Sequence, residues 1–186
     1  KIEWSNYDVI FGTIHRRENW GENIKKISKA LLKIINSMPN VALVIPLHPN
    51  PKVRNPLKKL LSNHPRIELI EPLDYLESIS CMKESKLVLT DSGGIQEEAP
   101  SLSKPVLVLR KNTERVEGLK AGTIKIIGTE TQTIYDETVK LLSDKNQYFK
   151  MANAKNPYGD GNACEKILIE CEKFLNNKTF QCKRYY

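Results

Sequence analysis

The chain has 186 residues, of which 40% are hydrophobic and 27% charged, and its formal net charge is +7 at pH 7. This length allows one domain with a substantial core, and the apolar runs are too short to cross a bilayer. The lysines are scattered over presumed helix faces, without a basic stripe interleaved with aromatic residues. We therefore interpret the lysines as solvated surface and expect no nucleic-acid partner and no membrane attachment. Some of the charge could help attract small anionic ligands.

The first residues show no signal peptide, and the four cysteines lack the CxxC spacing of metal or redox sites. We expect a cytoplasmic protein without disulfides, bound metal or cofactor. The chain opens without Met and reaches a strand almost at once, so we interpret it as a piece of a longer polypeptide.

The first half of the chain alternates strand and helix patterns. Short β-branched and aromatic runs predict strands over residues 7–13, 41–45 and 67–70. Apolar residues at helical spacing predict helices over residues 23–36, 53–61 and 75–83. Three prolines between residues 46 and 51 cannot lie in a helix interior, and they predict a rigid loop that carries His48.

The second half continues the alternation. We predict strands over residues 87–89, 105–109 and 123–127, helices beginning near Ile95 and over residues 133–142 and 163–175, and a loop over residues 110–122. Residues 1–175 then form one domain, and residues 176–186 form a polar tail.

Repeated alternation without hairpin signals indicates an α/β fold with a Rossmann-like, doubly wound parallel sheet. In such sheets, ligands bind beyond the carboxyl ends of the strands. Polar segments that begin at His15, His48, Ser92 and Arg110 each follow a predicted strand. We therefore expect the functional side chains to lie together at one edge of the sheet.

The segment around Ser92, Gly93 and Gly94 joins a buried strand to a helix. Glycine lets a ligand approach the backbone, and the first N–H groups of a helix favour a phosphate. Glu97 or Glu98, one turn later, could accept hydrogen bonds from sugar hydroxyls. An ordinary strand-to-helix turn with Ser92 as its N-cap is the alternative.

A second polar segment, His15-Arg16-Arg17-Glu18-Asn19, follows the first strand. Arginine offers planar, bidentate donors to phosphate oxygens, so this segment could hold a diphosphate. A charged surface loop is the alternative.

Four segments together resemble the non-hydrolysing UDP-N-acetylglucosamine 2-epimerases, over roughly residues 5–175. They are Thr-Asp-Ser-Gly-Gly-Ile-Gln-Glu-Glu-Ala-Pro at 90–100, His-Arg-Arg-Glu-Asn at 15–19, His-Pro-Asn-Pro at 48–51 and Arg-Lys-Asn-Thr-Glu-Arg-Val-Glu-Gly at 110–118. The resemblance implies the C-terminal, nucleotide-binding domain, which is one half of a glycosyltransferase-B-type architecture. The family interconverts UDP-GlcNAc and UDP-ManNAc by elimination and re-addition of UDP.

The resemblance also implies roles for particular residues. His15 would be catalytic, and the UDP-binding residues would be Arg16, Ser92, Gly93, Gly94, Glu98 and Arg115. In some bacterial members, a second, activating UDP-GlcNAc is bound with the help of residues that correspond to His48 and Arg16. A structural loop histidine is the alternative for His48.

Two positions depart from the family pattern. Ser78 stands where a phenylalanine near the uracil is common, which removes a stacking surface. Val116 replaces a usual proline, so the loop around it is expected to be less rigid.

The resemblance implies that the acidic residues that move the C2 proton lie in an N-terminal domain, outside this chain. We expect this fragment to be inactive without that domain, and the full-length enzyme to be a homodimer. Three alternatives remain open: half of a glycosyltransferase-B-type glycosyltransferase, a hydrolysing epimerase, and a nucleotide-sugar sensor.

Overall fold

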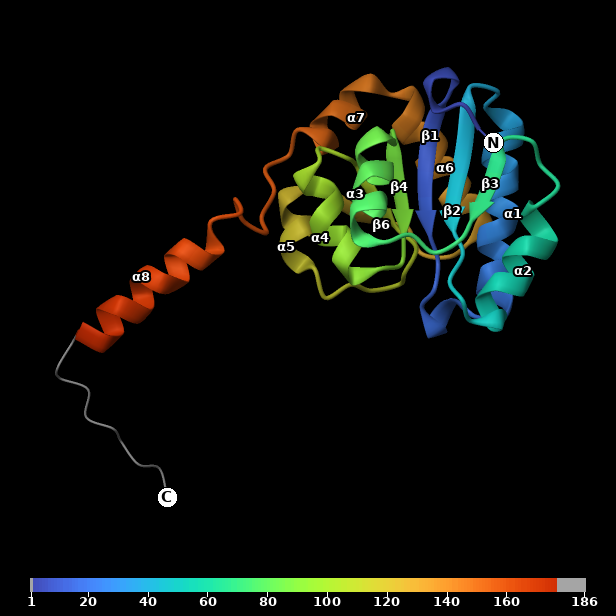
Figure 1. The fold of residues 1–186 in the computed structure, drawn as a ribbon. Helices are drawn as coiled ribbons and strands as arrows, with labels where there is room; N and C mark the ends of the chain where they lie inside the picture. Colours follow the sequence, from blue (N-terminus) through green and yellow to red (C-terminus); the bar gives the residue numbers. More distant parts are fainter. Residues whose placement is uncertain (1, 177–186) are drawn as a thin grey trace.

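A computed structural model describes residues 2–176, and its centre is a six-stranded parallel sheet (Figure 1). The strand order is β3-β2-β1-β4-β5-β6. The strands are β1 (Asp8–Thr13), β2 (Val41–Pro46), β3 (Ile67–Ile70), β4 (Leu87–Thr90), β5 (Val106–Val108) and β6 (Ile124–Ile126). This topology confirms the predicted doubly wound sheet.

Helices cover both faces of the sheet. The face covered by α1 (Glu22–Ser37), α2 (Pro51–Leu61), α6 (Thr131–Ser143) and α7 (Lys145–Ala152) holds the larger core. The other face is covered by α3 (Tyr75–Glu84), α4 (Gly93–Ser101) and α5 (Val116–Ala121). Short 3₁₀ turns occupy Trp4–Asn6 (η1) and Arg17–Asn19 (η2).

The strands are hydrophobic on both faces because both are covered by helices. In β1, Ile10 points into the larger core, and its neighbour Phe11 points into the smaller one. Both side chains are fully buried. The register of β1 against β4 places Thr13 beside Thr90, so these two strands end together.

Several predicted boundaries were wrong. The predicted loop over residues 110–122 contains α5, which buries only Gly118. Helix α7 was not predicted. Gly93 and Gly94 form the first turn of α4 rather than a turn before it, and Pro46 still belongs to β2. Residues 177–186 of the predicted polar tail lie outside the described residues.

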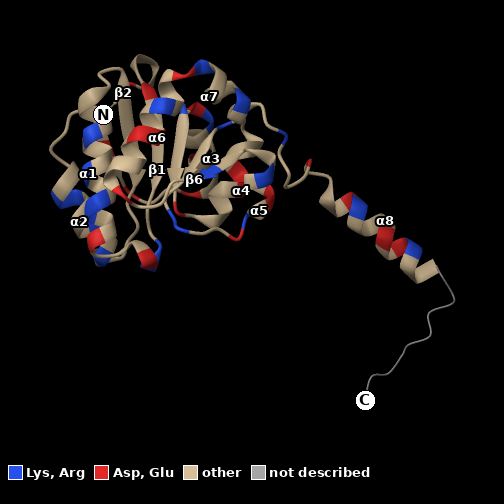
Figure 2. Cartoon of the chain, turned by 180° about the vertical axis from the view of Figure 1, so that it is seen from behind, with Lys and Arg blue, Asp and Glu red and all other residues tan. Residues whose placement is uncertain are grey.

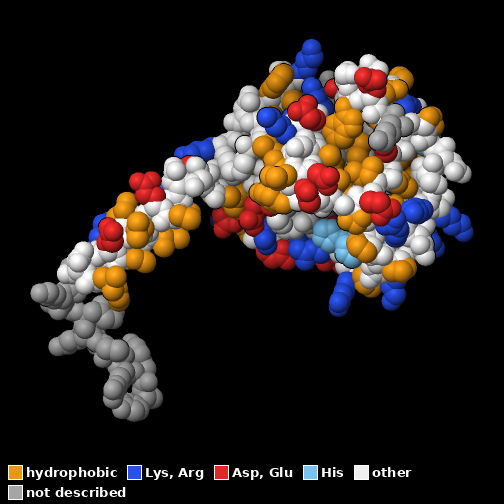
Figure 3. Space-filling model, viewed as in Figure 1, with side chains coloured by type: hydrophobic (Ala, Val, Ile, Leu, Met, Phe, Trp, Pro, Cys, Tyr) orange, Lys and Arg blue, Asp and Glu red, His pale blue; other side chains and the backbone are white. Residues whose placement is uncertain are grey.

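The last helix, α8 (Ala163–Asn176), extends away from the rest of the chain (Figure 1). None of its residues is buried, and its apolar side chains Ile167, Leu168, Phe174 and Leu175 are more than half exposed. Figure 3 shows orange, hydrophobic side chains along this helix. The predicted helix is therefore present, but it adds nothing to the core.

Basic and acidic residues are interspersed along the helices and loops (Figure 2). Across residues 2–176, no helix is long and apolar enough to cross a membrane.

Candidate functional site

The candidate site lies where β1, β4 and β5 end. The loop after β1 carries His15 and Arg16, the turn after β4 carries Asp91 and Ser92, and the loop after β5 carries Arg115. Histidine side chains gather at the same edge of the molecule in Figure 3. The structure thus brings together the segments that the sequence predicts at one edge of the sheet.

The N-terminus of α4 faces two guanidinium groups. A Cβ atom built on Gly93 would lie 3.1 Å from Arg115 Cζ and Nη2, and 3.3 Å from Arg16 Nη2. The first N–H groups of a helix have no intrahelical acceptor and carry the positive end of its dipole. Two cations and a helix N-terminus therefore converge at a glycine, which suits an anion with several oxygens.

Ser92 and Glu98 flank this position. Ser92 occupies the N-cap position of α4, but its hydroxyl does not cap the helix. Glu98 is half-buried, and its Oε1 lies 3.8 Å from a Cβ built on Gly94. Neither side chain donates or accepts a hydrogen bond within the described part of the chain. Both are therefore available to a ligand.

Arg115 is oriented by its neighbours. Its Nε donates to Glu97 Oε1 at 2.7 Å, and its backbone N–H donates to Thr113 Oγ1 at 3.1 Å. Thr113 Oγ1 in turn donates to Gln96 Oε1 at 2.6 Å. The loop after β5 is thereby fixed to α4. Glu97 orients the Arg115 guanidinium through this ion pair.

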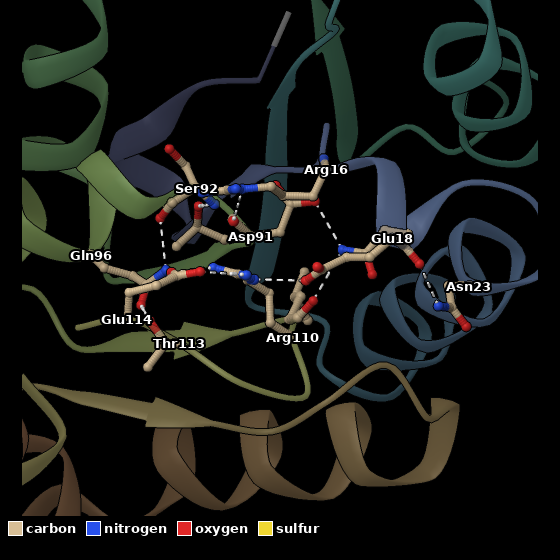
Figure 4. A network of polar contacts seen from close by, with 12 residues as sticks. Arg16, Glu18, Asn23, Asp91, Ser92, Gln96, Arg110, Thr113 and Glu114 are labelled. Carbon is tan, nitrogen blue, oxygen red and sulfur yellow. Dashed lines mark hydrogen bonds and ion pairs between the residues drawn. The ribbon is translucent and has the colours of Figure 1, made fainter. Parts of the chain in front are cut away.

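Arg110 ties the loop after β5 to the loop after β1. Its side chain is almost fully buried and binds Glu18 Oε1 at 2.7 Å and Glu114 Oε2 at 2.9 Å (Figure 4). The Arg110 guanidinium holds the pKa of Glu114 at about 2, well below its usual range. Glu114 is thereby held in an ion pair at the edge of the site.

His15 and His48 stack on each other, with ring centroids 5.8 Å apart. Burial lowers the pKa of His15, Asp91 opposes that shift, and His48 and Arg16 add to it. Nδ1 of His48 accepts the N–H of Asn50 at 3.1 Å, which leaves its Nε2 to donate. The two rings therefore line one side of the site.

A groove of about 180 Å³ runs beside the two histidines. Ser78, Leu73 and Ile95 line it together with His15 and His48. It is narrow, largely apolar and placed next to the cations around Gly93, so a flat ring could lie in it while an attached anion reaches α4.

Asp91 and Asn19 were not predicted as site residues. Asp91 is fully buried, and its carboxylate accepts the Nδ2–H of Asn19 at 2.9 Å. Asn19 also donates to the carbonyl of Leu109 at 3.0 Å. The sequence offered one signal, a charged residue directly after a hydrophobic strand, but its partners depend on the strand order.

The chain is similar in sequence to known proteins over most of its length. A family described as UDP-N-acetylglucosamine 2-epimerase matches residues 1–170. A curated UDP-N-acetylglucosamine 2-epimerase of Neisseria meningitidis is 52% identical over 165 residues, which is 89% of this chain and 44% of that protein. The Escherichia coli K12 enzyme is 46% identical over 170 residues, 91% of this chain and 44% of its own length. The chain thus spans less than half the length of these relatives.

The chain also superposes on solved structures over most of its length. A complex of Staphylococcus aureus MnaA with UDP superposes with a TM-score of 0.90 at 48% identity, over 98% of this chain and 50% of that one. A Neisseria meningitidis UDP-GlcNAc 2-epimerase bound to UDP-GlcNAc gives a TM-score of 0.87 at 50% identity, over 91% of this chain and 46% of that one. The chain has the α/β fold of about half of each of these glycosyltransferase-B-like structures.

Proposed function

Because the chain belongs to the UDP-N-acetylglucosamine 2-epimerase family, we propose that it is the nucleotide-binding half of an enzyme that interconverts UDP-GlcNAc and UDP-ManNAc. The observation that carries this proposal is the convergence of Arg16, Arg115 and the α4 N-terminus on Gly93. A UDP diphosphate there would meet two fixed cations and free backbone N–H groups.

Each flanking residue then has a role. Ser92 donates its hydroxyl to a phosphate oxygen, and Glu98 accepts hydrogen bonds from the ribose. The uracil ring lies in the groove beside Ser78, whose small side chain leaves room there but offers no stacking surface. His15 is half-buried and lines the groove, and in this proposal it faces the diphosphate.

The proposed reaction requires the site to stabilise negative charge on the UDP diphosphate. Elimination of UDP from the sugar breaks the C1–O bond and puts developing negative charge on the β-phosphate. Fixed donors that face this charge lower the barrier because they need no reorganisation during the reaction. The same contacts would hold UDP while the 2-acetamidoglucal intermediate waits for re-addition on its other face.

Proton transfer at C2 belongs, in this proposal, to an N-terminal half outside this chain. The apolar side chains Ile167, Leu168 and Leu175 of α8 are more than half exposed, which suits a surface that another part of a longer protein covers. A homodimeric, cytoplasmic full-length enzyme is part of the same proposal. His48 and Arg16 would also contact a second, activating UDP-GlcNAc.

The experiment is calorimetric titration of this chain with UDP, together with a coupled epimerase assay. We expect UDP binding without turnover, and turnover once the other half is restored. A chain that binds no UDP would contradict the assignment of the site. Epimerisation by the isolated chain would contradict the division of roles between the two halves. Release of free ManNAc and UDP by the restored enzyme would indicate a hydrolysing epimerase.

A further inference from the structure

The carboxylate of Asp91 organises the loop after β1. It is fully buried, and its Oδ1 and Oδ2 accept the backbone N–H of His15 at 3.1 and 3.0 Å. Oδ2 also accepts the backbone N–H of Arg16 at 2.9 Å and the side-chain N–H of Asn19 at 2.9 Å. All these donors belong to one short segment, residues 15–19.

The backbone of Asp91 adds two further links. Its N–H donates to the carbonyl of Thr13 at 3.2 Å, which continues the β1–β4 ladder. Its own carbonyl accepts from Arg16 Nε at 3.3 Å, and Figure 4 shows the Arg16 side chain beside Asp91 and Ser92. Asp91, the residue directly after β4, therefore fixes both the backbone and the Arg16 guanidinium of the neighbouring loop.

Burial of a carboxylate is costly unless donors satisfy its oxygens. Here the donors are neutral N–H groups of the loop after β1, two from its backbone and one from the side chain of Asn19. The hydroxyls of Thr13 and Thr90, 2.6 Å apart, hold the two strand ends beneath it. One buried carboxylate thus holds the start of this loop, and the Arg110–Glu18 ion pair holds it further along.

We propose that Asp91 is a positioning residue, whose carboxylate holds residues 15–19 so that the side chains of His15 and Arg16 face the N-terminus of α4. The inference rests on the proposed function, because it concerns the same diphosphate site. Asp91 itself does not touch the ligand and acts through the two residues it holds.

The carboxylate also acts on the His15 ring, because Oδ1 lies 3.6 Å from Nδ1. Asp91 raises the pKa of His15, whereas burial, His48 and Arg16 lower it. A protonated His15 attracts a diphosphate more strongly than a neutral one. UDP affinity should therefore rise as the pH falls through the pKa of His15, and loss of the Asp91 charge should move this rise to lower pH.

The test compares Asp91→Asn with Asp144→Asn in this chain. Asn keeps the shape of the side chain and removes its charge. Asp144 is a matched control because its carboxylate also accepts backbone N–H groups, from Asn146 at 2.9 Å and Gln147 at 3.1 Å, at the start of α7 and outside the site. Each variant is titrated with UDP between pH 5 and pH 8, and the histidine ring signals are followed by NMR, with His64 as an internal reference.

For Asp91→Asn we expect UDP affinity to fall about tenfold to one hundredfold, as for lost hydrogen bonds to a charged group. The pKa of His15 should fall, and the pKa of His64 should stay unchanged. Asp144→Asn should leave UDP affinity within about twofold of wild type, because Asn also caps a helix and Asp144 lies outside the site. Unchanged UDP affinity and an unchanged His15 titration in Asp91→Asn would overturn the proposal.

Two further measurements keep the test decisive. If Asp91→Asn does not fold, Asn19→Ala leaves the carboxylate in place and removes one of its donors. That variant should weaken UDP binding severalfold, and wild-type binding by it would overturn the proposal. If the wild-type chain binds no UDP, the proposed function fails. The His15 titration in Asp91→Asn still decides whether Asp91 positions the ring.

Discussion

Substitution of Gly93 by alanine tests the anion site most directly. Gly93 is the first residue of α4, and its φ is not positive, so alanine fits the backbone without strain. The added Cβ would lie 3.1 Å from Arg115 Cζ and 3.3 Å from Arg16 Nη2, closer than ordinary contact. Both neighbours are the ends of flexible side chains. The chain should therefore keep its fold while the two cations move away from the helix N-terminus.

The magnitude follows from these contacts. Loss of one hydrogen bond between a guanidinium and a phosphate costs about 1.5–3 kcal/mol, which weakens UDP binding about tenfold to one hundredfold. Gly93→Val should weaken binding further because its side chain is larger. Alanine also has the higher helix propensity, so thermal stability should not fall.

Calorimetry with UDP and a thermal melt measure both effects. Gly94→Ala is the comparison, since a Cβ there meets only Glu98 Oε1 at 3.8 Å, an ordinary contact distance. It should weaken UDP binding at least tenfold less than Gly93→Ala does. Wild-type affinity in both Gly93 variants would refute the placement of the diphosphate, and equal losses at Gly93 and Gly94 would refute the role of the guanidinium groups.

Three other predictions concern neighbouring groups. Ser92→Ala and Glu98→Ala should each weaken UDP binding by about 1–3 kcal/mol in calorimetry, because each side chain is free to bind the ligand; wild-type affinity in both would argue against these contacts. In a full-length enzyme, His15→Ala should lower kcat more than it raises KM in steady-state assays, because in the proposed reaction His15 acts on charge that develops as the C1–O bond breaks. A change confined to KM would mean that it only binds the ground state. The pKa of Glu114 is lowered to about 2, so its pairing with Arg110 stabilises the fold above the pKa of an unfolded glutamate, about 4.3, and this contribution is lost as the pH falls towards 2. The free energy of unfolding, measured with denaturant and circular dichroism, should therefore fall in the wild type as the pH is lowered from about 4.3 towards 2. Glu114→Gln should make this pH dependence weaker in that range.

The strands and the long helices could be predicted because their apolar periodicity is strong. Helix α1 buries Ile24, Ile27, Leu31 and Ile34 at regular spacing, and the predicted bounds differ from the observed ones by one residue at each end. Helix α5 was missed because six residues with one buried glycine carry no such pattern. Helix α7 was also missed, although Asp144 at its start is a typical N-cap residue.

The site was predicted in part for a related reason. Ser92, Gly93 and Gly94 could be recognised because a strand, a turn and a helix are adjacent in the sequence. The contacts of Asp91 with Asn19, and of Arg110 with Glu18, join segments more than 70 residues apart. They exist because β1, β4 and β5 are neighbours, and a single sequence does not reveal strand order.

That strand order has a thermodynamic consequence. The two arginines and the α4 N-terminus follow three neighbouring strands, β1, β4 and β5, which one hydrogen-bond ladder joins. Their mutual positions are set when the sheet folds, and Asp91, Glu97 and Arg110 restrict what freedom remains. A diphosphate that binds here would order few additional side chains, so binding would cost the protein little conformational entropy. The two arginine side chains lose most of their conformational freedom when the chain folds and not when a ligand binds.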